Sequence, residues 1–165
     1  MSSKMSLIAF FCVMGLALIL PSHAQDEKQE YLDSHNAARK AVGVPPLTWN
    51  QTLADYAQNY ANKLESTNNC QLKHSEGSPY GENLAWSSAP ELTATAAVQL
   101  WVEEIAFYDY KTNSCQADKM CGHYTQVVWN TTEQVGCAKA LCKSGGALFS
   151  CNYFPTGNFV GVKPY

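Results

Sequence analysis

Two histidines and two glutamates are the side chains of this sequence best suited to chemistry. Each histidine closely follows a cysteine, four residues after Cys70 in one case and two after Cys121 in the other, so disulfides there would immobilise both imidazoles. One glutamate lies in the same polar stretch as the first histidine, and the other falls on the apolar stripe of a predicted helix. Imidazoles and carboxylates that meet in a cleft can bind a divalent cation such as zinc. We therefore expect a cavity lined by His74, Glu82, Glu104 and His123.

A structural role for these four residues is the main alternative. Each histidine can pair with a glutamate at the edge of the core, with neither a metal nor a reaction. Hydrolysis has little support, because the sequence contains no His-Glu-x-x-His, no Gly-x-Ser-x-Gly and no third histidine near the set. We therefore expect no catalytic residue and no required cofactor, and we treat zinc or another divalent cation at His74 and His123 as optional.

Aromatic side chains gather at the end of the third predicted helix and in the loop before Cys115. The simplest explanation is that they pack as core and lid residues. The alternative is an apolar loop that accepts a sterol or another lipid, which an acidic protein can bind without electrostatic attraction. The residues of this predicted lipid-binding loop are Trp101, Phe107, Tyr108 and Tyr110.

The first 24 residues have the pattern of a cleavable signal peptide. Lys4 precedes an apolar run at 7–20 that is too short to span a bilayer comfortably. Small residues at the ends of the tripeptide 22–24 match the positions that signal peptidase reads. No later apolar run of transmembrane length and no lipidation motif follows. We expect secretion of one mature domain, 25–165.

Composition and cysteine content limit what the mature chain does. Cleavage removes one lysine, so eleven basic residues become ten against fourteen acidic ones. Such a surface does not favour nucleic acid or anionic membranes. One of the seven cysteines also leaves with the signal. The six that stay predict three disulfides in an oxidising compartment.

The spacing of the cysteines favours one of the fifteen formally available pairings. A hairpin turn at Gly145-Gly146 would place Cys137 opposite Cys151, within bridging distance. Cys142 lies an odd number of residues from Cys137, on the other face of the strand, so it needs another partner. A short loop can close between two further cysteines. The favoured pairs are Cys137 with Cys151, Cys115 with Cys121, and Cys70 with Cys142.

Hydrophobic periodicity predicts helices followed by strands. A helix is expected over 25–42, a second one after a capping box at 48–51, and a third over 91–107. Between the last two, 66–90 reads as a long loop. Strands are expected at 123–129, 135–141 and 147–153. Two glycosylation sequons begin at Asn50 and Asn130.

Four motifs in order point to a known family: GENLA at 81–85, HYTQVVW at 123–129, CNY at 151–153 and PTGN at 155–158. From about residue 29 to its end, the chain resembles the plant pathogenesis-related protein 1 family of the CAP superfamily (cysteine-rich secretory proteins, antigen 5 and pathogenesis-related proteins 1). The resemblance implies an α+β fold, an α-β-α sandwich in which helices flank an antiparallel sheet. It also implies the three disulfides above and the cavity of two histidines and two glutamates.

The resemblance implies a secreted, monomeric defence protein of the plant apoplast. Some members of the family inhibit fungi and oomycetes by binding sterols, so the resemblance implies sterol or related lipid and pathogen membrane components as the expected partners. No enzymatic activity is established for the family in general, which leaves a divalent-metal-dependent hydrolase as a minor alternative.

A further alternative concerns the C-terminal segment 155–165, which resembles a defence-signalling peptide released from some family members. That peptide usually follows an aspartate, whereas this chain has Phe154 at the position before Pro155. The simpler interpretation is an ordinary C-terminal segment that packs on the sheet.

Overall fold

A computed structural model describes residues 23–165. The predicted signal peptide, 1–24, lies outside these residues apart from its last two. No helix in the described range is long and apolar enough to cross a membrane. The elements in chain order are α1 (His23–Val42), β1 (Thr48–Trp49), α2 (Gln51–Asn68), β2 (Gly81–Ser87), α3 (Ala94–Val102), the 3-10 helix η1 (Glu103–Phe107), β3 (Tyr108–Asp109), β4 (Ser114–Cys115), α4 (Gly122–Val127), β5 (Gln134–Leu141) and β6 (Ala147–Phe154).

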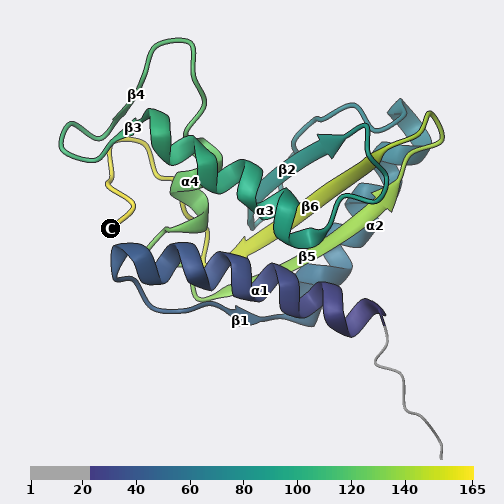
Figure 1. The fold of residues 1–165 in the computed structure, drawn as a ribbon, viewed down its shortest axis with the longest axis horizontal. Helices are drawn as coiled ribbons and strands as arrows, with labels where there is room; N and C mark the ends of the chain where they lie inside the picture. Colours follow the sequence, from purple (N-terminus) through teal and green to yellow (C-terminus); the bar gives the residue numbers. More distant parts are fainter. Residues whose placement is uncertain (1–22) are drawn as a thin grey trace, which may run out of the picture.

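The architecture is an α-β-α sandwich, as the resemblance implied. The central sheet has the order β1-β5-β6-β2, and a second sheet pairs only β3 with β4. The central sheet is antiparallel except that the short β1 runs parallel to β5. Helix α2 packs against β5 and β6, while α1, α3 and α4 pack on one another as the other helical layer (Figure 1). The larger core cluster includes residues of both this layer and the sheet.

Helix α2 forms where it was predicted but begins differently. Thr48 belongs to β1, so the predicted capping box is wrong. Asn50 is the N-cap, and its side-chain oxygen accepts from the backbone N–H groups of Thr52 and Leu53 at 2.8 and 3.3 Å. The first turn of α2 then lies directly on Gly136 of β5, where an added Cβ would come within 2.1 Å of the Ala54 nitrogen. This close approach fixes α2 on the sheet.

Two further sequence predictions are wrong. The predicted loop 66–90 contains the last residues of α2 and all of β2, which pairs along its whole length with β6. The predicted strand at 123–129 is mainly the helix α4. Its run of threonine and valine residues resembles a strand. The segment forms a helix because the carboxylate of a distant residue, Glu104, accepts the backbone N–H groups of its first turn.

Helix α1 and strands β5 and β6 agree with the sequence prediction, whereas the short strands β1, β3 and β4 were not predicted. The third predicted helix, 91–107, is α3 continued by η1, and its N-cap is Thr93, whose hydroxyl accepts the Ala96 N–H at 3.1 Å. Strands β5 and β6 flank a turn in which Gly145 and Gly146 have φ of +89° and +88°. All three disulfides pair as inferred: Cys70–Cys142, Cys115–Cys121 and Cys137–Cys151.

Candidate functional site

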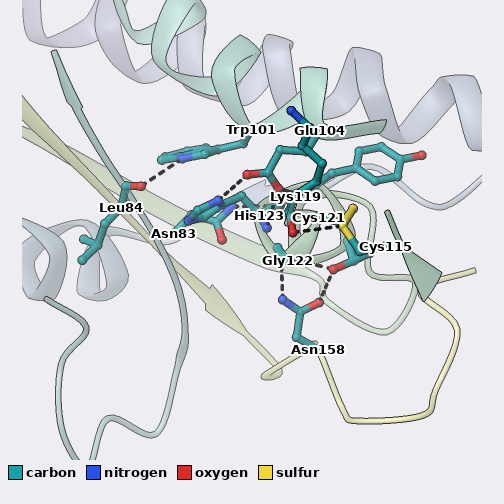
Figure 2. Close-up of polar contacts among 12 residues, drawn as sticks. Asn83, Leu84, Trp101, Glu104, Cys115, Lys119, Cys121, Gly122, His123 and Asn158 are labelled. Carbon is teal, nitrogen blue, oxygen red and sulfur yellow. Dashed lines mark hydrogen bonds and ion pairs between the residues drawn. A yellow bond between two sulfur atoms is a disulfide. The ribbon is translucent and has the colours of Figure 1, made fainter. Parts of the chain in front are cut away.

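The Glu104 carboxylate joins η1 to α4. Its Oε1 lies 2.6 Å from Nδ1 of His123, and its Oε2 accepts the backbone N–H groups of His123 and Tyr124 at 3.0 and 3.1 Å. Figure 2 shows the two side chains pointing toward each other, with the Trp101 ring beside His123. Both side chains are largely buried, at 17% exposed for His123 and 13% for Glu104. The same carboxylate therefore orients the imidazole and starts the helix that carries it.

The second pair joins the segment after α2 to β2. His74 Nδ1 lies 2.8 Å from Glu82 Oε1, which also accepts the Ser75 N–H at 3.0 Å. The imidazole is 63% exposed and the carboxylate only 6%. The hydrogen bond to Glu82 raises the pKa of His74. Burial opposes ionisation of Glu82, but the hydrogen bonds from His74 and Ser75 outweigh it and hold the pKa of that carboxyl below its usual value.

Asn83 connects the two pairs through β2. Its side-chain amide donates to the His123 carbonyl at 3.0 Å (Figure 2) and to the Tyr153 hydroxyl at 3.1 Å. Because Glu82 and Asn83 are successive strand residues, their side chains leave β2 in opposite directions. Each predicted histidine thus contacts one predicted glutamate, His74 with Glu82 and His123 with Glu104. Sequence reasoning missed Asn83, although it is the third residue of the GENLA motif.

A buried polar chain continues from Tyr153 to α1. The Tyr153 hydroxyl lies 2.8 Å from His35 Nε2, and His35 Nδ1 lies 2.7 Å from the Tyr31 carbonyl. A carbonyl only accepts, so Nδ1 carries the proton and Nε2 accepts from Tyr153. His35 was missed as a polar site residue because its spacing on α1 matches the apolar stripe of that helix.

The four side chains are of the types that bind a divalent cation. Their ligand atoms, however, are not as closely spaced as those of a formed metal site. Each imidazole uses Nδ1 for its carboxylate, which leaves Nε2 as a metal donor and fixes the ring, as carboxylates behind zinc ligands do. Glu82 Oε2 is buried without a hydrogen-bond partner. Within 23–165, however, the single group of three donor side chains with ligand atoms within 4.8 Å of one another is His35, Cys137 and Cys151, whose sulfurs form a disulfide.

The predicted lipid-binding aromatics do not all lie together. Trp101 is 2% exposed and donates its indole N–H to the Leu84 carbonyl at 3.2 Å, so it is a core residue and not part of the loop surface. The other three belong to η1 and the β3–β4 hairpin. Phe107 and Tyr108 are partly buried, and Tyr110 is 40% exposed.

The two sequon asparagines occupy different environments. Asn50 uses its side-chain oxygen to cap α2 and donates its amide to Gln134 Oε1 at 2.6 Å. Asn130 is exposed in the turn between α4 and β5. Asn130 is therefore the more accessible acceptor, and glycosylation of either residue stays a prediction.

Comparison with known proteins agrees with this fold. The model of the CAP family, described as the cysteine-rich secretory protein family, matches residues 32–153. The chain is similar to pathogenesis-related protein 1C of Nicotiana tabacum, with 51% identity over 99% of this chain and 96% of the relative. It is also similar to pathogenesis-related protein 1 of Arabidopsis thaliana, with 53% identity over 96% and 94%.

Solved structures share the fold. The chain resembles venom allergen-like protein 4 of Schistosoma mansoni with a TM-score of 0.67 and 30% identity, covering 85% of this chain and 94% of that one. The chain also resembles the crystal structure of NaASP2 with Zn²⁺, with a TM-score of 0.71 and 24% identity, covering 86% of this chain and 85% of that one. Six paired cysteines and these relatives imply an extracellular protein. The chain belongs to the CAP, or cysteine-rich secretory protein, family, and within it to the plant pathogenesis-related protein 1 group.

Proposed function

We propose that this protein is exported to the apoplast, binds a sterol or related lipid, and by this binding inhibits fungi or oomycetes. One observation supports the proposal most directly. The short segment from η1 to the loop before α4 exposes Ile105 at 48%, Tyr110 at 40% and Met120 at 62%. Exposed apolar side chains that form a contiguous patch, unlike those that are scattered singly, commonly mark a binding surface.

The segment is also rigid enough to present such a surface. The Cys115–Cys121 disulfide closes its loop, and the Gln116 N–H donates to the Phe107 carbonyl at 2.9 Å. The Lys119 ammonium lies 4.7 Å from the centre of the Phe107 ring. A preformed apolar surface loses little conformational entropy when a ligand binds. We call Ile105, Phe107, Tyr108, Tyr110 and Met120 the apolar loop face.

The double variant Ile105→Ser with Met120→Ser should weaken sterol binding at least tenfold. Removing two exposed apolar side chains from the contact lowers the area that the ligand can bury, and about 1.4 kcal/mol of lost binding energy gives a tenfold change. Binding is measured by co-purification of tritiated sterol with the secreted protein. Inhibition of fungal or oomycete growth should fall in parallel.

A matched control comes from the other end of the molecule. Leu72 and Leu141 are 51% and 64% exposed, close to the values for Ile105 and Met120. Leu72→Ser with Leu141→Ser should leave sterol binding unchanged. Equal losses in the two double variants, or no sterol retained by the wild type, would show that the apolar loop face is not a lipid site.

We also propose that His74 and His123 bind zinc weakly through Nε2. Two oriented imidazoles and the unpaired Glu82 oxygen support this proposal, and a structural relative has been crystallised with Zn²⁺. Calorimetry at pH 7.5 should show uptake of one zinc ion that His74→Ala and His123→Ala each weaken more than tenfold. Glu76→Ala removes an exposed carboxylate next to His74 and should change nothing. Unaltered uptake in both histidine variants would contradict the proposed ligands.

A further inference from the structure

The last three residues of the chain occupy a site built by other parts of the fold. The Tyr165 ring stacks on Tyr110 with centroids 4.5 Å apart and planes 7° apart. The Tyr110 hydroxyl donates to the Tyr165 carbonyl oxygen. The Tyr165 hydroxyl lies 3.1 Å from the hydroxyl of the buried Tyr124 on α4. Tyr165 is thus held by its ring, its hydroxyl and its carbonyl oxygen.

The two residues before Tyr165 are held as specifically. Pro164 is buried, and its carbonyl accepts the Asn130 backbone N–H at 2.7 Å. Proline has no N–H to satisfy, which suits a position where only the carbonyl is bonded. The Lys163 ammonium lies 4.5 Å from the centre of the Tyr110 ring and donates to the Lys111 carbonyl at 3.4 Å.

An exposed segment separates this contact from the rest of the tail. Asn158 bonds to the Gly122 carbonyl at 2.7 Å and to Thr125 at 2.8 Å, which fixes the tail on α4 (Figure 2). Beyond it, Val160 is fully exposed and Val162 is 53% exposed. Residues 160–162 are therefore exposed between two segments that contact the rest of the fold. Residues 163–165 lie in their site as a peptide ligand would, joined to the domain by this exposed segment.

We propose that Tyr110, Tyr124 and Asn130 form a peptide-binding site for Lys-Pro-Tyr segments, and that the chain's own residues 163–165 are its resident ligand. The stacked Tyr110 ring selects an aromatic third residue, and the Tyr110 hydroxyl recognises the carbonyl of that residue. The Asn130 N–H recognises the carbonyl of the preceding residue. A tail cut in its exposed segment stays bound, and an emptied site takes the same peptide from solution.

The test uses a chain that ends at Val162 and a synthetic peptide of residues 159–165. Titration followed by amide NMR should show saturable binding with a dissociation constant of about 1 mM or tighter. The shifts should centre on Tyr110, Tyr124 and Asn130. A peptide with Tyr165→Ala should bind at least tenfold more weakly. Val160→Ala changes a fully exposed residue and should leave the affinity unchanged. The full-length chain, whose site is filled, should not respond.

A second variant covers the case in which the shortened chain does not fold. A protease recognition sequence inserted at Val160 of the full chain is cut after folding, and the amide spectrum is recorded at millimolar protein. Unchanged signals for Tyr110 and Asn130 after the cut would support the proposal. Loss of those signals, binding of the peptide elsewhere, or equal affinity for the Tyr165→Ala peptide would overturn it.

Discussion

Replacing Arg39 with methionine should lower the free energy of unfolding by about 5 kcal/mol, because a buried acceptor left without a donor costs roughly 1 to 3 kcal/mol. The guanidinium is completely buried and bonds only to backbone carbonyls. It donates to Pro45 at 2.7 Å, to Val127 at 3.0 Å, to Trp129 at 2.8 Å and to Thr132 at 2.9 Å. Methionine fills similar volume but donates nothing, so all four carbonyls lose the guanidinium donor, and the Trp129 carbonyl keeps only the Thr132 N–H at 3.1 Å.

Arg39 keeps its positive charge although it is buried. Desolvation lowers the pKa of the guanidinium to about 10, which still leaves it protonated at neutral pH. Three of its acceptors lie between the end of α4 and the start of β5. Arg39 therefore fixes the segment that follows His123, and its loss should also disturb the tail contact at Asn130.

Urea unfolding at pH 7 with disulfides intact measures the effect. Lys40→Met removes the exposed neighbouring cation on the same helix and should change stability by less than about 0.5 kcal/mol. Arg39→Lys keeps the charge but loses the planar fork, so it should fall between the wild type and Arg39→Met. Similar stabilities for Arg39→Met and Lys40→Met would show that water satisfies these carbonyls.

Local pattern predicts the parts of this fold that depend on local interactions. The helical periodicity of α1, α2 and α3 and the Gly145-Gly146 turn between β5 and β6 are readable from neighbouring residues. The turn sets the strand register, and the register placed Cys137 opposite Cys151. Disulfide pairing followed from that register by elimination.

The two misread elements depend on partners far away in sequence. Strand β2 is defined by pairing with β6, about seventy residues later, and its residues Gly81, Glu82 and Asn83 have low strand propensity. Helix α4 depends on the Glu104 carboxylate at its first turn. No window of sequence around either element contains the group that stabilises it.

The candidate site was predictable in residue type but not in geometry. The sequence predicted a set of two histidines and two glutamates, and each histidine contacts one glutamate of the set. The placement of Glu82 beside Asn83 on β2 could not be predicted while 66–90 was interpreted as a loop. Trp101 was placed on the lipid loop because its helix phase relative to the sheet was unknown.

Lowering the pH from 7 to 4 should cost about 3 kcal/mol of stability through His35 alone, since each unit of pKa difference between folded and unfolded states is about 1.4 kcal/mol. Complete burial lowers the pKa of His35 from 6.5 to about 4, and the nearby Arg39 charge adds to the effect. Protonating Nε2 would also point an N–H at the Tyr153 hydroxyl. That hydroxyl would then accept from both His35 and Asn83 and lose the acceptor for its own proton.

The sign follows from which state takes up the proton. Below pH 6.5 the unfolded chain protonates this histidine while the folded chain does not, so acid favours unfolding. The contribution of His35 is complete above pH 6.5 and disappears as the pH falls to about 4. His74 acts oppositely, because its raised pKa gives stability that is lost as the pH rises through its folded value. Glu82, with a lowered pKa, loses its contribution only below the unfolded carboxyl value of 4.5.

Two glutamine variants separate these contributions. His35→Gln keeps a donor and an acceptor but does not titrate, so its unfolding free energy should be lower at pH 7 and nearly flat between pH 6.5 and 4.5. His74→Gln should keep the full decline, slightly steeper, because the opposing titration is gone. Urea unfolding across that pH range gives both slopes. If wild type and His35→Gln decline in parallel, the acid sensitivity arises elsewhere. In the wild type, the His35 ring signals in NMR should then titrate near 6.5 and not near 4.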